Sequence, residues 1–404
     1  MSPSVQSRVP QPQVLSGIRV VELGQLIAGP FCGKILGEFG AEVIKVEPPG
    51  QGDPLRKWRL LKDGTSVWWQ VQSRNKRSVT LDLRHADGQD VCRKLIAEAD
   101  VLIENFRPGT LESWGLGWDR LSSINPGLIM LRISGYGQDG PRRDMPGFAA
   151  IGEAMGGMRY LTGEPGRVPV RTGVSMGDTL AALHGAIGVL LALYYRTVSG
   201  GKGQVIDVAL YEAVFNCMES LLPEYSAFGV VREPAGGALP GIAPSNAYSC
   251  NDGYVLIAGN GDSIFKRLME AIGRPDLAGD MSLRSNEGRV ARAEELDAAI
   301  GEWTEGRSVN DVLHQLDKMR VPAGRIYTAE DIAKDVHYRA RDMIRKITTR
   351  QGYELEVPGI VPKLSLTPGV ISTPAPLLGD DTESVLGELL DANEIADLRA
   401  RNII

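Results

Sequence analysis

Residues 17–47, GIRVVELGQLIAGPFCGKILGEFGAEVIKVE, decide the predicted fold. An apolar strand over residues 17–23 leads through a loop into a short helix over residues 31–39, which Gly40 closes. A second strand covers residues 41–47, and Pro48-Pro49-Gly50 ends it. Because such strand–helix–strand units form parallel sheets covered by helices, the stretch predicts an α/β fold.

The same alternation continues along the chain. Apolar runs at residues 78–83, 101–105 and 128–134 predict further strands, and residues 86–98 form an amphipathic helical pattern. Two short helices are expected at 111–114 and 118–123, a long apolar helix extends to about residue 195, and 208–228 is a largely helical run. These elements predict one α/β domain with a dinucleotide-type wind.

A second domain is expected because 404 residues exceed what one small core needs. The Pro/Gly-rich residues 234–241 indicate a linker. A strand at 254–258 and helices at 263–272, 291–304 and 308–319 follow, and the last fifty or so residues return to strand and helix character.

Composition excludes several classes of function. The net charge of -6 gives no basic surface for nucleic acid. The four cysteines are far apart with no metal-binding spacing, which favours reduced thiols in the cytoplasm and no metal site. Residues 1–14 lack the apolar core of a signal peptide and are predicted to be a disordered leader. No membrane span is expected, because the nearest candidate, residues 181–195, is short and contains His184.

One carboxylate lies at the predicted N-terminus of the long apolar helix. The segment VPVRTGVSMGD, residues 168–178, delivers Asp178 from a Gly-containing loop to the start of the long apolar helix. The dipole and free N–H groups of a helix N-terminus favour the anionic form of a carboxylate. Asp178 is therefore either an N-cap residue or a nucleophile that is kept ionised.

Five segments carry a family resemblance. They are QLIAGP (25–30), GAEVIKVE (40–47), NKRS (75–78), ENFRPG (104–109) and GD (177–178). Their order and spacing resemble the class III CoA-transferases, which include formyl-CoA:oxalate and carnitine CoA-transferases, and the resemblance covers residues 15–390. It implies a large Rossmann-like domain built from both chain ends (15–225 and 335–404), a smaller inserted α+β domain (243–325), and two subunits interlocked as a homodimer.

The resemblance also implies covalent chemistry at Asp178. The carboxylate attacks an acyl-CoA thioester and gives an aspartyl–acyl anhydride and a CoA thiolate, which then attacks the aspartyl carbonyl to form an enzyme–CoA thioester. An acceptor carboxylate reverses the sequence. An ionised carboxylate needs no general base. Coenzyme A is thus carried as a substrate, and no resident cofactor is expected.

The resemblance places further residues near coenzyme A. A loop near the thioester, basic groups for phosphates, a channel for the pantetheine and a late glycine loop are expected. Gln25, Leu26, Ile27 and Ala28 match the loop near the thioester, and Lys76, Arg77 and Arg107 match the basic groups. Gln72 lies just ahead of the basic motif and is either a further contact or an ordinary surface amide. Asn105 and Phe106 match the channel, Phe148 is another candidate contact, and Gly259, Asn260 and Gly261 form the late loop. The basic groups could equally be surface charges, Phe106 could belong to the core, and the late loop could be a turn in which Asp262 or Ser263 caps a helix.

Three alternative functions make different demands on the sequence. A 2-methylacyl-CoA racemase needs a histidine in a Gly-His-Asp segment, and the matching place reads Gly147-Phe148-Ala149. A dinucleotide-dependent oxidoreductase needs Gly-x-Gly-x-x-Gly after the first strand, and the middle glycine is missing from Gly24–Gly29. A non-catalytic CoA-binding protein stays open, although it does not account for Asp178.

The acceptor is the open question. The segment RISGYGQDGP, residues 132–141, is more like family members that use succinyl-CoA and a dicarboxylate such as malate, citramalate, itaconate, mesaconate or glutarate, or a sulfinate analogue. A carnitine-type acceptor is disfavoured, because aromatic cages bind quaternary ammonium and the aromatic content is 6%. A second carboxylate needs a cation, and the sequence offers Arg171, Arg74, Arg142 and Arg143.

Overall fold

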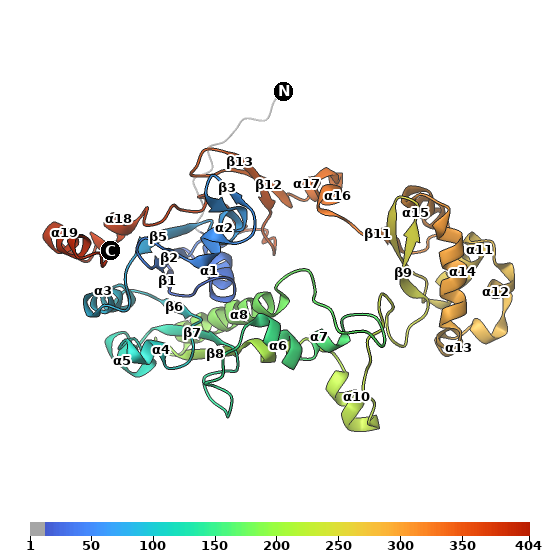
Figure 1. Cartoon of the computed structure of the whole chain (residues 1–404), viewed down its shortest axis with the longest axis horizontal. Helices are drawn as coiled ribbons and strands as arrows, with labels where there is room; N and C mark the ends of the chain where they lie inside the picture. Colours follow the sequence, from blue (N-terminus) through green and yellow to red (C-terminus); the bar gives the residue numbers. More distant parts are fainter. Residues whose placement is uncertain (1–12) are drawn as a thin grey trace. The chain divides into compact units, whose positions relative to one another are not determined.

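The structure is a computed structural model that describes residues 13–404, so the predicted leader lies almost entirely outside the described residues. The chain divides into two compact units (Figure 1). Unit 1 contains the described residues up to Arg159 together with Thr172–Ser220 and Arg339–Ile404, and unit 2 contains Tyr160–Arg171 and Leu221–Tyr338. The segment 160–171 therefore belongs to the second unit, whereas the prediction placed it inside the first part of the large domain, residues 15–225.

Unit 1 is built on a parallel sheet of six strands. In spatial order they are β5 (Lys76–Thr80), β2 (Glu42–Glu47), β1 (Arg19–Glu22), β6 (Val101–Glu104), β7 (Ile129–Ser134) and β8 (Val205–Ala209). The chain moves outward from β1 in one direction and then crosses back to continue from β6. This is the doubly wound order, in which ligands bind at the carboxyl ends of the two central strands where the direction reverses.

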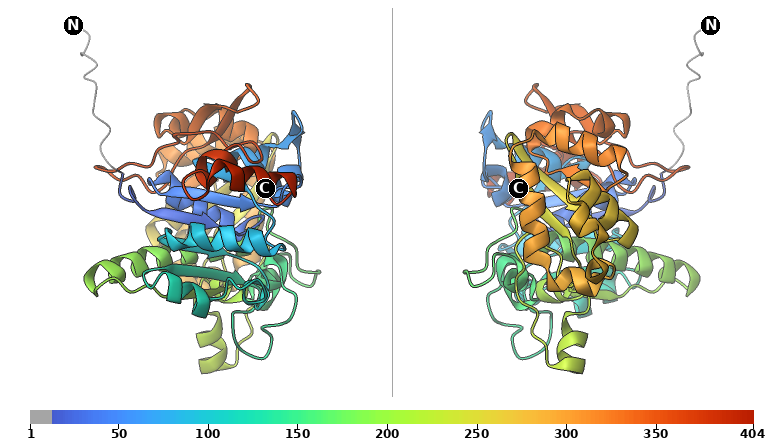
Figure 2. Two further views of the ribbon diagram at one scale, coloured as in Figure 1. Left: turned by 90° about the vertical axis from the view of Figure 1, so that its left-hand side faces the viewer. Right: turned by 90° about the vertical axis from the view of Figure 1, so that its right-hand side faces the viewer.

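Helices cover both faces of this sheet. Side chains alternate along the strands, so Val20 and Val101 pack toward α1 (Ala28–Glu38) and α8 (Met176–Val198), whereas Val21 and Leu102 pack toward the opposite core. That second core is closed by α3 (Ala86–Ala97), α5 (Trp118–Ile124), α18 (Thr382–Leu386) and α19 (Ala392–Ala400), several of which face the viewer in the left view of Figure 2.

Shorter elements complete unit 1. They are η1 (Pro54–Lys57), β3 (Leu61–Lys62), β4 (Thr65–Ser66), α2 (Val67–Gln72), α4 (Thr110–Ser113), α6 (Ala149–Met155), α9 (Leu210–Phe215), β12 (Ile344–Thr348) and β13 (Glu354–Pro358). The predicted helical run from residue 208 was wrong at its start, because β8 extends to Ala209. The strand passes directly into α9 without a glycine or proline, so the apolar run gave no sign of the change.

Helix α8 is the longest helix of unit 1. By length and composition it is the one helix among the described residues that could cross a membrane, with 44% of the apolar window buried inside the protein. Its buried side packs against α1, β7 and β8. Gly185 and Gly188 make this approach possible, because a Cβ atom there would lie 2.8 Å from Leu131 and 2.8 Å from Ile206. The packed side is that of a core helix lying on a sheet.

Unit 2 has its own sheet and core. Its antiparallel strands run in the order β11 (Ala323–Arg325), β10 (Gly253–Ala258) and β9 (Ser245–Cys250). Val255, Leu268 and Ile300 belong to a core formed by this sheet and the surrounding helices, which the right view of Figure 2 shows in yellow and orange. The helices are α10 (Leu221–Phe228), α11 (Asp262–Ala271), α12 (Pro275–Gly279), η2 (Met281–Leu283), α13 (Asn286–Ala291), α14 (Ala293–Glu305), α15 (Val309–Lys318) and α16 (Ala329–Lys334). Two short helices, α7 (Met158–Leu161) and α17 (Val336–Ala340), contain unit boundaries.

Candidate active site

The loop after β1 is joined to the end of β6, where the winding of the sheet reverses. Asn105 follows β6, and its Oδ1 accepts a hydrogen bond of 2.7 Å from the backbone N–H of Gln25. Its Nδ2 donates to the carbonyl of Gln25 at 2.9 Å. Gly24 is required beside this contact, because a Cβ atom there would lie 3.0 Å from Asn105 Oδ1. Two segments predicted to touch coenzyme A thus meet at the edge where this fold binds ligands.

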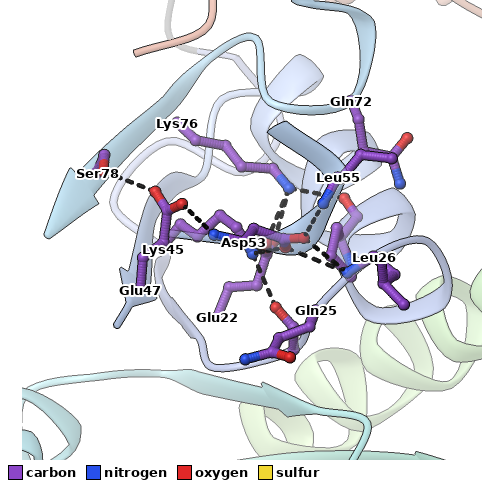
Figure 3. A network of polar contacts seen from close by, with 12 residues as sticks. Glu22, Gln25, Leu26, Lys45, Glu47, Asp53, Leu55, Gln72, Lys76 and Ser78 are labelled. Carbon is purple, nitrogen blue, oxygen red and sulfur yellow. Dashed lines mark hydrogen bonds and ion pairs between the residues drawn. The ribbon is translucent and has the colours of Figure 1, made fainter. Parts of the chain in front are cut away.

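The loop is held in an unusual backbone conformation at Leu26, whose φ is 63°. A residue with a side chain adopts this left-handed region at a cost, and such strain persists only where the surroundings impose it. Here the carboxylate of Asp53 accepts the N–H of Leu26, at 3.1 Å from both oxygens. The close view in Figure 3 shows this contact within a larger polar network beneath the loop.

Buried lysines and carboxylates form this network. Lys45 Nζ lies 2.8 Å from Asp53 and 3.0 Å from Glu22, and it donates to the carbonyl of Gly24 at 2.8 Å. Burial alone would lower the pKa of Lys45, but Asp53 and Glu22 outweigh it and raise that pKa. Lys45 is therefore a fixed cation that holds both ends of the contact between the loop and Asp53.

Lys76 belongs to the same network, and its predicted contact with a phosphate is wrong. The residue is only 3% exposed, and its Nζ lies 2.7 Å from Glu22 and 2.7 Å from the carbonyl of Pro30. Burial lowers the pKa of Lys76 to about 8, against the opposing effect of Glu22. Lys76 supports the loop from below. Gln72 does the same, since its Nε2 donates to the carbonyl of Ile27 at 2.9 Å.

The two other basic candidates, Arg77 and Arg107, have partners within unit 1. The half-exposed Arg77 pairs with Glu42 and lies 3.7 Å from Asp381, so its guanidinium is committed to carboxylates. Arg107 is exposed and donates to the carbonyl of Asp144 at 2.8 Å.

The aromatic candidates differ in exposure. Phe106 packs edge-on against Trp114 at 5.3 Å and borders the core. Phe148 precedes α6 and is 72% exposed. Phe148 therefore does not belong to the hydrophobic core of unit 1.

Asp178 lies in the first turn of α8, three residues beyond the N-cap residue Ser175. The interpretation of Asp178 as an N-cap is therefore wrong, because a capping residue precedes the helix. Its side chain is half-buried. The position keeps the carboxylate within the positive field of the helix N-terminus, which favours the anion.

A second carboxylate, that of Glu153 on α6, reaches this helix terminus. Glu153 is 1% exposed; its Oε1 accepts the N–H of Gly177 at 3.2 Å, and its Oε2 accepts from Arg159 at 3.2 Å. Gly177 permits the approach of α6, since a Cβ atom there would lie 3.0 Å from the carbonyl of Ala149. Glu153 thus fixes the backbone next to Asp178.

We expect Glu153→Ala to lower kcat for CoA transfer about 10- to 100-fold, because the turn that carries Asp178 loses its anchor and small misplacements are costly in catalysis. The KM for acyl-CoA should change little. Glu153→Gln keeps an acceptor for Gly177 and should retain more of kcat. Steady-state kinetics of both variants, with the exposed Glu302→Ala as control, test this; a rise in KM at constant kcat would contradict a positioning role.

A mainly apolar cavity of about 500 Å³ in unit 1 reaches the N-terminus of α8, and Asp178 itself is not among its lining residues. The N-cap residue Ser175 and Thr179 of the first turn of α8 line it, and so do Ile27 and Gln72. The remaining lining residues are Phe31, Arg59, Leu60, Val67, Trp68, Val71 and Val174. The cavity therefore brings two predicted contact residues next to the turn that carries the predicted nucleophile.

The late glycine loop lies in unit 2 and is tied down by Arg289. This buried side chain donates to the carbonyl of Asn260 at 2.8 Å and to Asp262 at 2.9 Å. Gly259 is needed because a Cβ atom there would lie 2.4 Å from Leu268. Gly261 is the N-cap of α11, so neither Asp262 nor Ser263 caps this helix as the alternative interpretation expected.

Four residues around the site were not predicted from the sequence: Glu22, Lys45, Asp53 and Glu153. A signal existed for two of them, because Glu22 and Lys45 interrupt the apolar strands β1 and β2 near their carboxyl ends. Charged residues at such places are buried only when paired. Glu153 carried no comparable signal. Among residues 13–404, no group of three or more His, Cys, Asp or Glu side chains could hold a metal ion.

The chain is similar to known proteins along nearly its whole length. The model of CoA-transferase family III matches residues 15–382. The succinyl-CoA–D-citramalate CoA-transferase of Chloroflexus aurantiacus is 47% identical over 397 residues, covering 97% of this chain and 98% of that protein. The succinate–glutarate CoA-transferase of Agrobacterium fabrum is 34% identical over 384 residues, covering 93% of this chain and 95% of that one. A crystal structure of a CAIB/BAIF family protein from Brucella suis matches with a TM-score of 0.85 at 36% identity, covering 94% of this chain and 100% of that chain. The chain belongs to CoA-transferase family III and is a CoA-transferase.

Proposed function

We propose that the protein transfers CoA from succinyl-CoA to a dicarboxylate, with Asp178 as the nucleophile. The observation that carries this proposal is the position of Asp178 in the first turn of α8, where Ser175 and Thr179, on either side of it in the sequence, line the apolar cavity. The names of two relatives, succinyl-CoA–D-citramalate CoA-transferase and succinate–glutarate CoA-transferase, support the substrate class.

The proposed reaction has two halves. The Asp178 carboxylate attacks the thioester carbonyl, the C–S bond breaks, and the CoA thiolate leaves an aspartyl–succinyl anhydride. The thiolate then attacks the aspartyl carbonyl, succinate leaves, and CoA is held as an aspartyl thioester. The acceptor carboxylate attacks that thioester, and the released thiolate attacks the acceptor's acyl group in the new anhydride. This regenerates Asp178, and no step needs a proton shuttle.

The loop over residues 24–28 has a defined part in this proposal. Its backbone is fixed by Asn105, Asp53 and Lys45 before any substrate binds. A preorganised loop loses little entropy when it receives a thioester, and that lowers the barrier for a reaction that depends on positioning. Coenzyme A enters and leaves as a substrate, and the chain's own residues supply the chemistry.

An acceptor assay tests the proposal. The protein is incubated with succinyl-CoA and, in turn, malate, citramalate, itaconate, mesaconate, glutarate and a sulfinate analogue, and the acyl-CoA products are separated by chromatography. We expect a new dicarboxylyl-CoA together with one equivalent of succinate. Hydrolysis without transfer, or transfer only to monocarboxylates, would contradict the proposed substrate class.

We also propose that the protein works in the cytoplasm as an interlocked homodimer. An exposed apolar strip along α8 supports this assembly, since patches of this kind mark interfaces. Its members are Leu183, Ile187, Leu190, Leu191, Tyr194, Tyr195 and Val198. Light scattering should give twice the mass of one chain, and the pair Leu191→Glu and Tyr194→Glu should shift it toward the single chain. A wild-type monomer at micromolar concentration would refute the dimer.

A further inference from the structure

The cavity at the N-terminus of α8 is lined by apolar side chains except at Arg59, Gln72, Ser175 and Thr179. Of the described residues that line it, Arg59 is the one cation, and it is an exposed residue. A substrate with an apolar middle and a terminal carboxylate needs such a lining, because a carboxylate brought out of water requires a charged hydrogen-bond donor. Arg59 can bind an anion if its guanidinium is oriented by the protein and is not already paired with a carboxylate.

The guanidinium of Arg59 lies over the ring of Trp68, 4.6 Å from its centroid. Trp68 belongs to α2 and lines the same cavity. Stacking on an aromatic face fixes the plane of a guanidinium and leaves the N–H donors at its edge directed outward. The backbone of Arg59 is also constrained, with φ of 58°, which is unusual for a residue with a side chain.

Arg59 differs from Arg74 and Arg143 in its partners. Among residues 13–404, no carboxylate lies within ion-pair distance of Arg59. By contrast, Arg74 is fully buried against Glu38, with Nε 2.7 Å from Oε1, and Arg143 lies 3.4 Å from Asp144. Arg74 and Arg143, both suggested from the sequence, thus already face carboxylates of the chain. The guanidinium of Arg59 has no carboxylate partner among the described residues and can bind the carboxylate of a ligand.

We propose that Arg59 binds the distal carboxylate of the succinyl group and of the dicarboxylate acceptor, and so determines the preference for dicarboxylates. This inference rests on the proposed function, because it assigns one end of the proposed substrate to one side chain. Asp178 acts at the thioester end of the substrate, and Arg59 binds the carboxylate at its other end.

Binding measurements isolate this role from catalysis. In Asp178→Ala protein, succinyl-CoA and butyryl-CoA can be titrated by calorimetry without transfer, and the two differ by a terminal carboxylate against a methyl group. Adding Arg59→Met should weaken succinyl-CoA binding about tenfold, because an exposed residue loses the charged hydrogen-bond donor for the terminal carboxylate. Butyryl-CoA binding should stay within about threefold, since the apolar lining is unchanged. Arg59→Lys should recover part of the loss, because it keeps the charge but not the planar fork.

The controls separate the possible failures. Arg84→Met removes an exposed cation that pairs with Asp82, and it should alter neither affinity. Arg142→Met removes a rival candidate; a selective loss of succinyl-CoA binding there, and not in Arg59→Met, would overturn the assignment. Equal losses for both thioesters in Arg59→Met, or none, would also overturn it, and Arg59→Gln repeats the test if the methionine variant melts early. Failure of the Asp178→Ala protein to bind either thioester would instead count against the proposed function.

Discussion

Replacement of Asp178 by alanine is expected to lower CoA transfer by a factor on the order of 10⁴ or more, because both covalent intermediates are formed on this side chain. Asp178→Asn should be equally inactive, since a neutral amide is a poor nucleophile although it has nearly the same size. Neither change removes a core side chain, because Asp178 is half-buried in the first turn of α8. The melting temperature should therefore stay close to that of the wild type.

Trapping gives a direct readout of the same prediction. After incubation with succinyl-CoA, hydroxylamine should convert the acylated carboxylate to a hydroxamate, or borohydride should reduce it, and mass spectrometry should locate the change at Asp178. Asp119 provides a matched control, because it also lies in the first turn of a helix, α5, and is exposed. Asp119→Asn should keep full activity. Turnover by Asp178→Ala, or modification at another carboxylate, would remove the basis of the proposed mechanism.

Local patterns in the sequence were sufficient for the main frame of unit 1. The strands around Val21, Val46 and Leu131 were predicted because their apolar runs are bounded by glycine, proline or charged turns, and the helix that follows Asp178 was predicted from its length and apolar content. The family followed from the order of five short segments. These are features that lie within a few residues of one another along the chain.

Contacts between distant segments could not be predicted in this way. Lys76 was expected to contact a phosphate because NKRS matches the basic motif of the family, but β5 pairs with β2, which places that lysine against Glu22 from β1. Glu153 meets Gly177 only because α6 packs against the start of α8. Arg59 was missed because its relevance depends on Trp68 and on a cavity, and neither has a sequence signature.

The second large effect concerns Glu22, the buried carboxylate that faces both Lys45 and Lys76. Glu22→Gln is expected to destabilise the protein by about 3–5 kcal/mol, because removing one partner of a buried ion pair strands the opposite charge. The double variant Glu22→Gln/Lys76→Met removes one charge of each sign and should recover much of that loss. Denaturant unfolding of the wild type, the two single variants and the double variant gives the coupling energy. A loss within about 0.5 kcal/mol for Glu22→Gln would contradict the network.

The pH dependence of this loss supplies an independent check. In the folded wild type the pKa of Lys76 is about 8, below its ordinary 10.5, so between these values the unfolded chain binds more protons and folding stability rises with pH. Without Glu22 the folded pKa falls further and the rise begins at lower pH. The stability difference between wild type and Glu22→Gln should therefore shrink from pH 7 to pH 9. Because Lys76 and Lys45 also hold the carbonyls of Pro30 and Gly24, the same variant should raise the KM for acyl-CoA, which ties the stability of the network to the shape of the loop that receives the thioester.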